Sequence, residues 1–312
     1  MSVATVVGYL AWVAGELSLA ARRTALGVAA LLQSAPLLST LILRQVYPFL
    51  ALALAAAWIF DRRGRPIAAG AALGLAPAMK PLLVPVLLWP LARRRWGTFG
   101  AALASAAVAK FLGVLVTGPA ATFIEYPKVL SEVRLDGNPV HASLTGTATR
   151  LFTDAEFSDP VAYVPWAIPA ALVLGGGLVL LTAYIVRHDE GGTGLWALVA
   201  ASLLASPVAW HNYLLLLGPG ILMLMARGRM ALALLLLTLQ LIPPQWSEPW
   251  RGESTVLAAL ALTFYFYVLV VHWVAFLTYR EEAVEDPTTT ETDQGVPREQ
   301  KPSSPGTEPS PP

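Results

Sequence analysis

The chain has 312 residues, of which 56% are hydrophobic and 13% are charged, and its mean hydropathy is +0.60. A typical soluble domain carries roughly 25% charged residues, so the composition excludes an ordinary soluble protein and indicates an integral membrane protein. The net charge is only +1, and the sequence shows no concentration of basic residues that could form a nucleic-acid-binding face. The absence of cysteine excludes a disulfide framework and a thiolate metal site. We therefore predict no nucleic-acid partner. Motifs for a phosphate loop, a dinucleotide site and an H-E-x-x-H zinc site are absent from the sequence, so we also predict no cofactor and no metal site.

Apolar segments follow one another along the chain, many of them close to the roughly 20 residues that a helix needs to cross a bilayer. The longer segments are 3–20, 24–43, 45–60, 97–117, 161–186, 229–244 and 254–278, and the shorter ones are 66–79, 81–92, 194–209 and 213–226. The pattern predicts an all-α, polytopic membrane helical bundle of about eleven spans or half-spans. Glu16 lies in the first span, where we expect it to be buried and unpaired.

Arginines lie between these segments, and their positions predict which ends of the helices face the cytoplasm. Short loops rich in Lys and Arg tend to stay cytoplasmic, and basic positions occur at 22–23, 62–65, 93–95, 187, 227–229 and 280. If all of them are inside, the chain between two successive clusters must cross outward and return. Residues 1–279 then form a multi-pass domain with an external loop at 118–160. The polar tail 280–312 is predicted to be disordered and cytoplasmic.

Lys80 is the most informative charge, because it interrupts the apolar stretch 66–92 between Pro77 and Pro81. A single straight span would hold this lysine near the bilayer centre at a cost of about 2.5–3.5 kcal/mol. Each proline removes a helical hydrogen bond and restricts the residue before it, so we predict a broken hairpin with Lys80 at its external tip. A lysine that snorkels to the interface is the plain alternative. The functional interpretation is a cation for a phosphate head group.

Other polar groups fall on the same predicted face. They are Arg44 and Gln45 between two spans, Asp136, Asn138, His141, Ser143 and Arg150 in one turn-rich stretch, and Trp210, His211, Asn212 and Tyr213 after a proline. A solvated loop and an aromatic interface belt are the plain alternatives for these groups. A guanidinium on an apolar background can fork onto a phosphate or carboxylate, and an imidazole can contact a leaving phosphate.

Four motifs in this order resemble glycosyltransferase family 87. They are Arg44-Gln45, the Lys80-Pro81 pair, the pattern of Asn138, Ser143, Leu144, Gly146 and Arg150, and the pattern of Ser206, Pro207, Trp210 and Tyr213. The resemblance covers roughly residues 25 to 275. Members of this family are integral membrane enzymes of the GT-C superfamily, and they include polyprenyl-phosphate-mannose-dependent α-mannosyltransferases of actinobacteria. A chain rich in Ala, Leu and Arg suits such a high-GC bacterium.

The resemblance implies transfer of a hexose, usually mannose, from a polyprenyl-phosphate sugar to a lipid-linked or glycan acceptor on the extracytoplasmic face, among membrane lipids. An acidic residue in the first external loop acts as base in such enzymes, while cations steady the departing phosphate, as inverting transfer requires. The resemblance then implies that Lys80 and Arg150 contact the phosphate of the donor, and that His211 and Asn212 lie near the donor head group or the acceptor. The predicted substrate contacts are Lys80, Arg44, Gln45, Asn138, Ser143, Arg150, Trp210, His211, Asn212 and Tyr213.

The sequence also departs from the family's pattern. Arg44 stands where glycine is usual, and His211 directly follows Trp210, which displaces the family's histidine. The first span and the loop that carry the family's catalytic Asp are not found, so the base is unassigned. The native protein could be longer, the chain could be a noncatalytic subunit, or Glu125, Glu132 or Asp136 could substitute.

A transporter or flippase for an anionic lipid or solute is the rival class, because transporters also bind anions at broken helices. The external loop of about 40 residues and the lack of a paired inverted repeat favour the enzyme.

Overall fold

The computed structural model describes residues 2–119, 121–125, 128, 137–154, 157, 159–189, 192–251, 253 and 255–278. The predicted tail and two of the candidate acids, Glu132 and Asp136, lie outside the described residues. Within the described residues the chain forms helices, and its strand-like pairing is an isolated bridge between His141 and Trp210. The prediction of an all-α membrane bundle is therefore confirmed.

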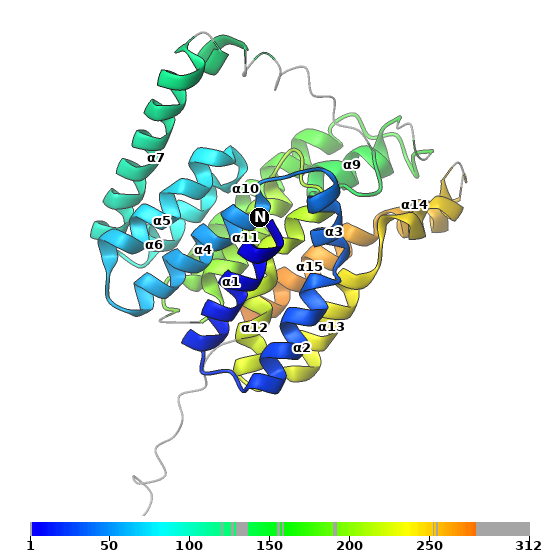
Figure 1. Ribbon diagram of the computed structural model, residues 1–312. Coiled ribbons are helices and arrows are strands. Elements are labelled where there is room, and N and C mark those ends of the chain that lie inside the picture. The colour runs from blue at the N-terminus through cyan, green and yellow to red at the C-terminus, as the bar shows by residue number, and fades with distance from the viewer. Residues whose placement is uncertain are drawn as a thin grey trace, which may run out of the picture. The chain divides into compact units, whose positions relative to one another are not determined.

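The helices occupy the apolar segments expected from the sequence (Figure 1). In chain order they are α1 (Ser2–Glu16), α2 (Ala21–Leu32), α3 (Ala35–Ile42), α4 (Tyr47–Arg62), α5 (Pro66–Met79), η1 (Pro81–Leu87), α6 (Leu88–Ala92), α7 (Trp96–Thr117), η2 (Ala121–Glu125), α9 (Leu144–Phe152), α10 (Ala167–Val186), α11 (Gly194–Ala205), η3 (His211–Leu217), α12 (Gly218–Ala226), α13 (Met230–Leu241), η4 (Pro244–Trp250), α14 (Val256–Leu262) and α15 (Phe264–Thr278).

Several of the predicted spans are broken rather than straight. In the described part of the chain, α7 and α10 are each long and apolar enough to cross a membrane alone. The pairs α2–α3, α13–η4 and α14–α15 bend by 48°, 64° and 53°, and each pair has the apolar length of one broken span. Ser34 marks the first bend, because its hydroxyl accepts a hydrogen bond from the amide of Leu37 and so starts a new helix.

The stretch around Lys80 folds as two short helical pieces. α5 has 14 residues and ends at Met79, Lys80 has an extended backbone with φ −137°, and the chain resumes as the 3₁₀ helix η1. A 14-residue helix is about 21 Å long, which is shorter than the roughly 30 Å hydrocarbon core. Lys80 therefore lies at a break between half-spans, as the prolines predict.

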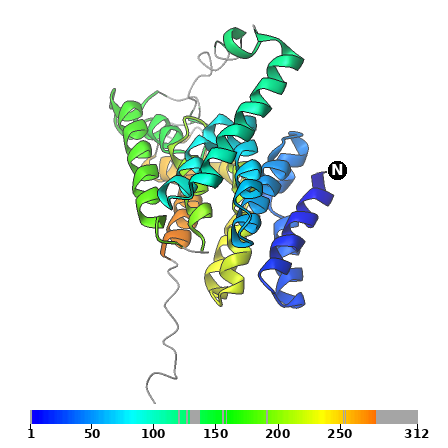
Figure 2. The same cartoon turned by 90° about the vertical axis from the view of Figure 1, so that its left-hand side faces the viewer.

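Two glycines set the contact between α5 and α7. A Cβ atom at Gly70 would collide with the carbonyl oxygen of Thr98, and one at Gly74 would collide with that of Ala102. Glycines four residues apart let two helix backbones approach closely within a membrane. Figures 1 and 2 show α7 running along α5 and extending past it at its C-terminal end.

Ion pairs join helices at the arginine-bearing end of the bundle. Asp61, near the end of α4, pairs with Arg93 at 2.9 Å and also with Arg95. Glu16 is the last residue of α1 and pairs with Arg63 at 2.6 Å. The expectation that Glu16 is unpaired is wrong, because α1 ends early enough to place this carboxylate beside the arginines that follow α4.

Candidate functional site

Polar side chains from distant parts of the chain meet at the helix ends opposite the arginines. Lys80 ends α5, whose other end follows Arg65, and Tyr47 begins α4, whose other end is Arg62. His211 begins η3, and the chain continues through α12 to Arg227. Each of these segments therefore runs from a basic turn at one end of the bundle to a polar group at the other.

Lys80 rests on two tyrosine rings. Its Nζ atom lies 5.2 Å from the ring centroid of Tyr47 and 5.7 Å from that of Tyr213, and the two rings are 4.4 Å apart. Both tyrosines are buried and Lys80 is half-buried. In the described part of the chain, no carboxylate lies within 4.0 Å of the ammonium group. The aromatic faces stabilise the cation and leave its charge available to an anion.

His211 and Asn212 supply buried polar groups directly before Tyr213, one of the two tyrosines that contact Lys80. A 2.8 Å hydrogen bond joins His211 Nε2 to the hydroxyl of Ser39, and the imidazole stacks at 4.9 Å on the ring of Tyr265. His211 Nδ1 and Asn212 Oδ1 are buried and have no hydrogen-bond partner among the described residues. Buried polar atoms are almost always paired in folded proteins. Other buried atoms such as Tyr9 Oη and Trp58 Nε1 also lack a partner, so it is their position next to Tyr213 that suits these two atoms to a bound polar group.

The loop after residue 137 packs on the segment that carries His211. The amide of Ala142 donates to the carbonyl of Ala209 at 2.7 Å, and the amide of His211 donates to that of Val140 at 2.9 Å. The rings of His141 and Trp210 meet edge to face, with centroids 4.6 Å apart. The structure therefore brings the third and fourth sequence motifs into direct contact.

Arg150 is fully buried, and its guanidinium holds this loop. It donates from Nε to the carbonyl of Gly137 at 3.0 Å, and from one terminal nitrogen to the carbonyls of Asn138 at 2.7 Å and His141 at 3.2 Å. The other terminal nitrogen donates to the hydroxyl of Thr263 at 3.1 Å. These bonds favour a positioning role for Arg150 over contact with a substrate phosphate.

Ser143 and Asn138 also act within the loop. The Ser143 hydroxyl accepts the amide of Gly146 and caps α9. The Asn138 side chain accepts the amide of Val140 at 3.1 Å, which closes a turn. Thr145 donates to the carbonyl of Pro207 at 2.7 Å and ties α9 to the segment that leads to Trp210.

Arg44 and Gln45 form the turn between α3 and α4, shortly before Tyr47. Arg44 is exposed and has a left-handed backbone, with φ +52°. Glycine adopts this conformation without strain, which gives a physical reason for the glycine usual at this position in the family that the motifs resemble. The Gln45 side chain donates to the carbonyl of Leu43 at 3.4 Å.

Among the described residues, acids and metal ligands are sparse near this site. Glu125 is exposed in η2, after the end of α7. Among the described residues, no group of three or more His, Asp or Glu side chains could hold a metal ion.

Sequence reasoning missed four residues of this region. Tyr47, Ser39 and Tyr265 contact Lys80 or His211, and aromatic or hydroxyl residues in apolar helices carry no distinctive signal. Lys110 did carry a signal, since it lies within the apolar span of α7. A cavity of about 350 Å³ lies beside it, lined by Ala78, Met79, Pro81, Ala109, Lys110, Gly113, Thr117 and Ala121.

A comparison with protein families gives one match. Residues 1–207 match the model of glycosyltransferase family 87, which is more than half of the chain. No curated protein and no solved structure gives a match. The matched range begins before residue 25 and ends before Trp210, whereas the resemblance was expected over 25 to 275. The interpretation of His211, Asn212 and Tyr213 therefore rests on their contacts in the structure.

Proposed function

Because the chain belongs to glycosyltransferase family 87, we propose that it transfers a hexose, mannose first among the candidates, from a polyprenyl-phosphate sugar to a lipid-linked or glycan acceptor. Family membership supports a membrane glycosyltransferase in general. The donor, the sugar and the face of the membrane are our proposal, and the arrangement of Lys80 is the observation that carries it.

Lys80 suits the departing phosphate of such a donor. Transfer of the sugar leaves negative charge on the polyprenyl phosphate, and a fixed cation aimed at that charge lowers the barrier. Lys80 is half-buried on Tyr47 and Tyr213, with no competing carboxylate within 4.0 Å among the described residues. Its place at a break between half-spans would let a phosphate reach it from the membrane edge.

The cavity beside Lys110 supports a lipid-borne donor. It lies between the α5–η1 break and α7, and it adjoins Met79 and Pro81, the two neighbours of Lys80. α7 exposes apolar side chains such as Phe111 and Leu115 nearby. A polyprenyl chain could therefore lie along α7, with Lys110 as a second cation near its phosphate.

We place His211 and Asn212 near the sugar or the acceptor, since their unpaired buried atoms suit hydroxyl groups. The carboxylates we propose to test as base are Glu125, Glu132 and Asp136, in the loop 118–160. We assign this end of the bundle to the extracytoplasmic face, because the basic turns lie at the other end and such turns favour the cytoplasm.

The test is transfer of labelled mannose from polyprenyl-phosphate mannose to a lipid extract of the source membranes by the purified full chain. Lys80→Ala should abolish transfer, Lys80→Arg should keep part of it, and both variants should stay folded in detergent. Arg23→Ala is the matched control, because it removes an exposed charge at the end of the bundle away from Lys80.

Full transfer by Lys80→Ala would remove the phosphate site from the proposal. No transfer by the unchanged protein with any polyprenyl-phosphate hexose would contradict the proposed donor and favour a noncatalytic role.

A further inference from the structure

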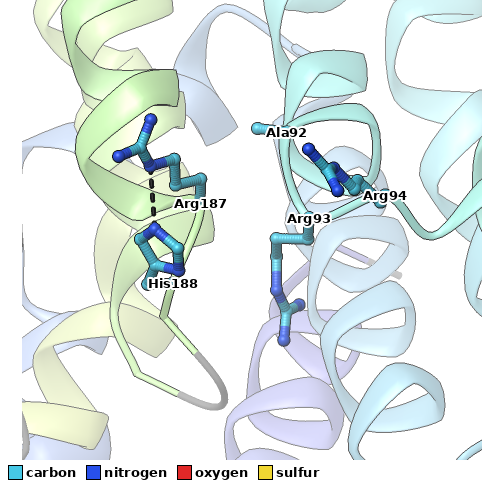
Figure 3. Close-up of a pocket in the computed structure, with 5 residues that line it drawn as sticks. All are labelled: Ala92, Arg93, Arg94, Arg187 and His188. Carbon is cyan, nitrogen blue, oxygen red and sulfur yellow. Dashed lines mark hydrogen bonds between the residues drawn. The ribbon is translucent and has the colours of Figure 1, made fainter.

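A second charged cavity lies at the opposite end of the bundle (Figure 3). Its volume is about 590 Å³, and it is lined by Ala92, Arg93, Arg94, Arg187 and His188. The turn after α6 supplies Arg93 and Arg94, and the turn after α10 supplies Arg187 and His188. In Figure 3 these two turns stand on opposite sides of the cavity.

The arginines of this cavity carry more charge than the described residues neutralise. Arg93 pairs with Asp61 at 2.9 Å. Arg94 and Arg187 are exposed, and among the described residues no carboxylate lies within 4.0 Å of either guanidinium. The carboxylate of Asp189 is engaged elsewhere, since it accepts the amides of Gly192 at 2.8 Å and Gly194 at 2.6 Å before α11.

Arg187 is held in place beside the cavity. Its guanidinium carbon lies 3.8 Å from the ring centroid of Tyr184, and its Nε donates to His188 Nε2 at 2.9 Å. Its terminal nitrogens make no hydrogen bond to the described residues, and Figure 3 shows its guanidinium turned away from Arg94, so they can donate to a ligand that lies along α10. A planar guanidinium with free terminal donors binds phosphate in a forked geometry.

The exposed surface of α10 that leads to the cavity is apolar. Val173 is 76% exposed, Leu180 is 65% exposed and Tyr184 is 60% exposed along α10, a helix long enough to cross the membrane. Tyr184 lies directly under the Arg187 guanidinium, so the apolar surface continues to the cavity. Basic pockets between membrane helices bind the head groups of anionic lipids.

We propose that this cavity binds the phosphate of an anionic phospholipid head group, with Arg187 as its main ligand, Arg94 adding positive charge from across the cavity, and the acyl chains lying along α10. A soluble phosphate compound would use the same two arginines, but it would gain nothing from the apolar surface. This site is separate from Lys80 and does not depend on the proposed function.

The test measures lipid binding to the full chain in detergent by native mass spectrometry, with phosphatidylglycerol as probe and phosphatidylcholine as reference. Each arginine near an anionic lipid contributes about fivefold to affinity. The double variant Arg94→Gln, Arg187→Gln should therefore bind phosphatidylglycerol about 25-fold more weakly. The matched control is Arg22→Gln, Arg23→Gln, which removes two exposed charges outside the cavity and should change binding far less than the cavity variant does.

A thermal shift with inorganic pyrophosphate separates a lipid from a soluble ligand, and we expect no stabilisation. Equal losses in the two double variants would overturn the proposal, because binding would then follow overall charge. Stabilisation by pyrophosphate without preference for phosphatidylglycerol would also overturn it. If the double variant misfolds, Arg94→Gln alone carries the same test, with an expected loss of about fivefold.

Discussion

Arg150 shows how a residue that resembles a substrate ligand can serve the fold instead. Its side chain is fully buried, and its three nitrogens donate to backbone carbonyls and to Thr263. Those bonds hold the loop that packs against the segment of His211. Arg150 therefore acts on the candidate site through the loop, from a distance.

Arg150→Met should lower the free energy of unfolding in detergent by about 3 kcal/mol or more, because it removes several charge-assisted hydrogen bonds from a buried position. Thr263→Val removes one of these bonds and should cost only about 1 kcal/mol. Denaturant titration of both variants measures the difference. If Arg150→Met has unchanged stability but no sugar transfer, Arg150 contacts the phosphate of the substrate and does not mainly hold the loop.

The candidate site was only partly predictable from the sequence. Lys80 was predictable because a lone cation between prolines in an apolar run has few structural uses. The support from Tyr47 and the bond between Ser39 and His211 were not, since they depend on how distant helices pack. The hydrogen bonds of Arg150 were not predictable either, because its partners lie on a separate loop and on Thr263.

At the scale of elements, the close approach of α5 and α7 rests on Gly70 and Gly74. Gly74→Ala places a methyl group against the carbonyl of Ala102. Overpacking of this kind costs about 1–3 kcal/mol, whereas alanine gains at most about 1 kcal/mol over glycine within a helix. We therefore expect a net loss of stability, measured as a lower midpoint of thermal unfolding in detergent.

Gly100→Ala in α7 is the control, since a Cβ atom there meets no other atom within 4 Å. It should leave stability unchanged or raise it. A Gly74→Ala variant as stable as Gly100→Ala would show that the two helices can separate without penalty.

Most helix positions were predictable, because apolar length and flanking arginines specify where a membrane helix begins and ends. The bends within the segments 24–43, 229–244 and 254–278 were missed. Local hydrogen bonding causes the first of them, where Ser34 caps a new helix, and hydropathy does not report such a cap. The end of α1 at Glu16 was missed because the pairing of that carboxylate requires Arg63, which is distant in sequence.

At the scale of the whole molecule, the basic turns and the candidate site occupy opposite ends of one bundle. The absence of cysteine makes this arrangement testable, because a single introduced thiol has no native competitor. Arg251→Cys should react with a membrane-impermeant maleimide added to intact cells, since Arg251 is exposed and follows η4. Arg23→Cys should react only after the membrane is opened.

Labelling of both variants after permeabilisation is the control for thiol reactivity. Reaction of Arg23→Cys in intact cells, with Arg251→Cys protected, would reverse the proposed orientation and place Lys80 on the cytoplasmic face.

The break at Lys80 also bears on how the chain enters the membrane during synthesis. α5 and the η1–α6 piece are each too short to anchor in a bilayer, so the insertion machinery must accept them together as a hairpin. α7 emerges next from the ribosome and is long enough to insert unaided. Its arrival completes the packing surface for Gly70 and Gly74. The pair of short helices that carries Lys80 therefore packs fully only after α7 has been synthesised. If the ribosome stalls before α7, the pair stays in the membrane without its packing partner.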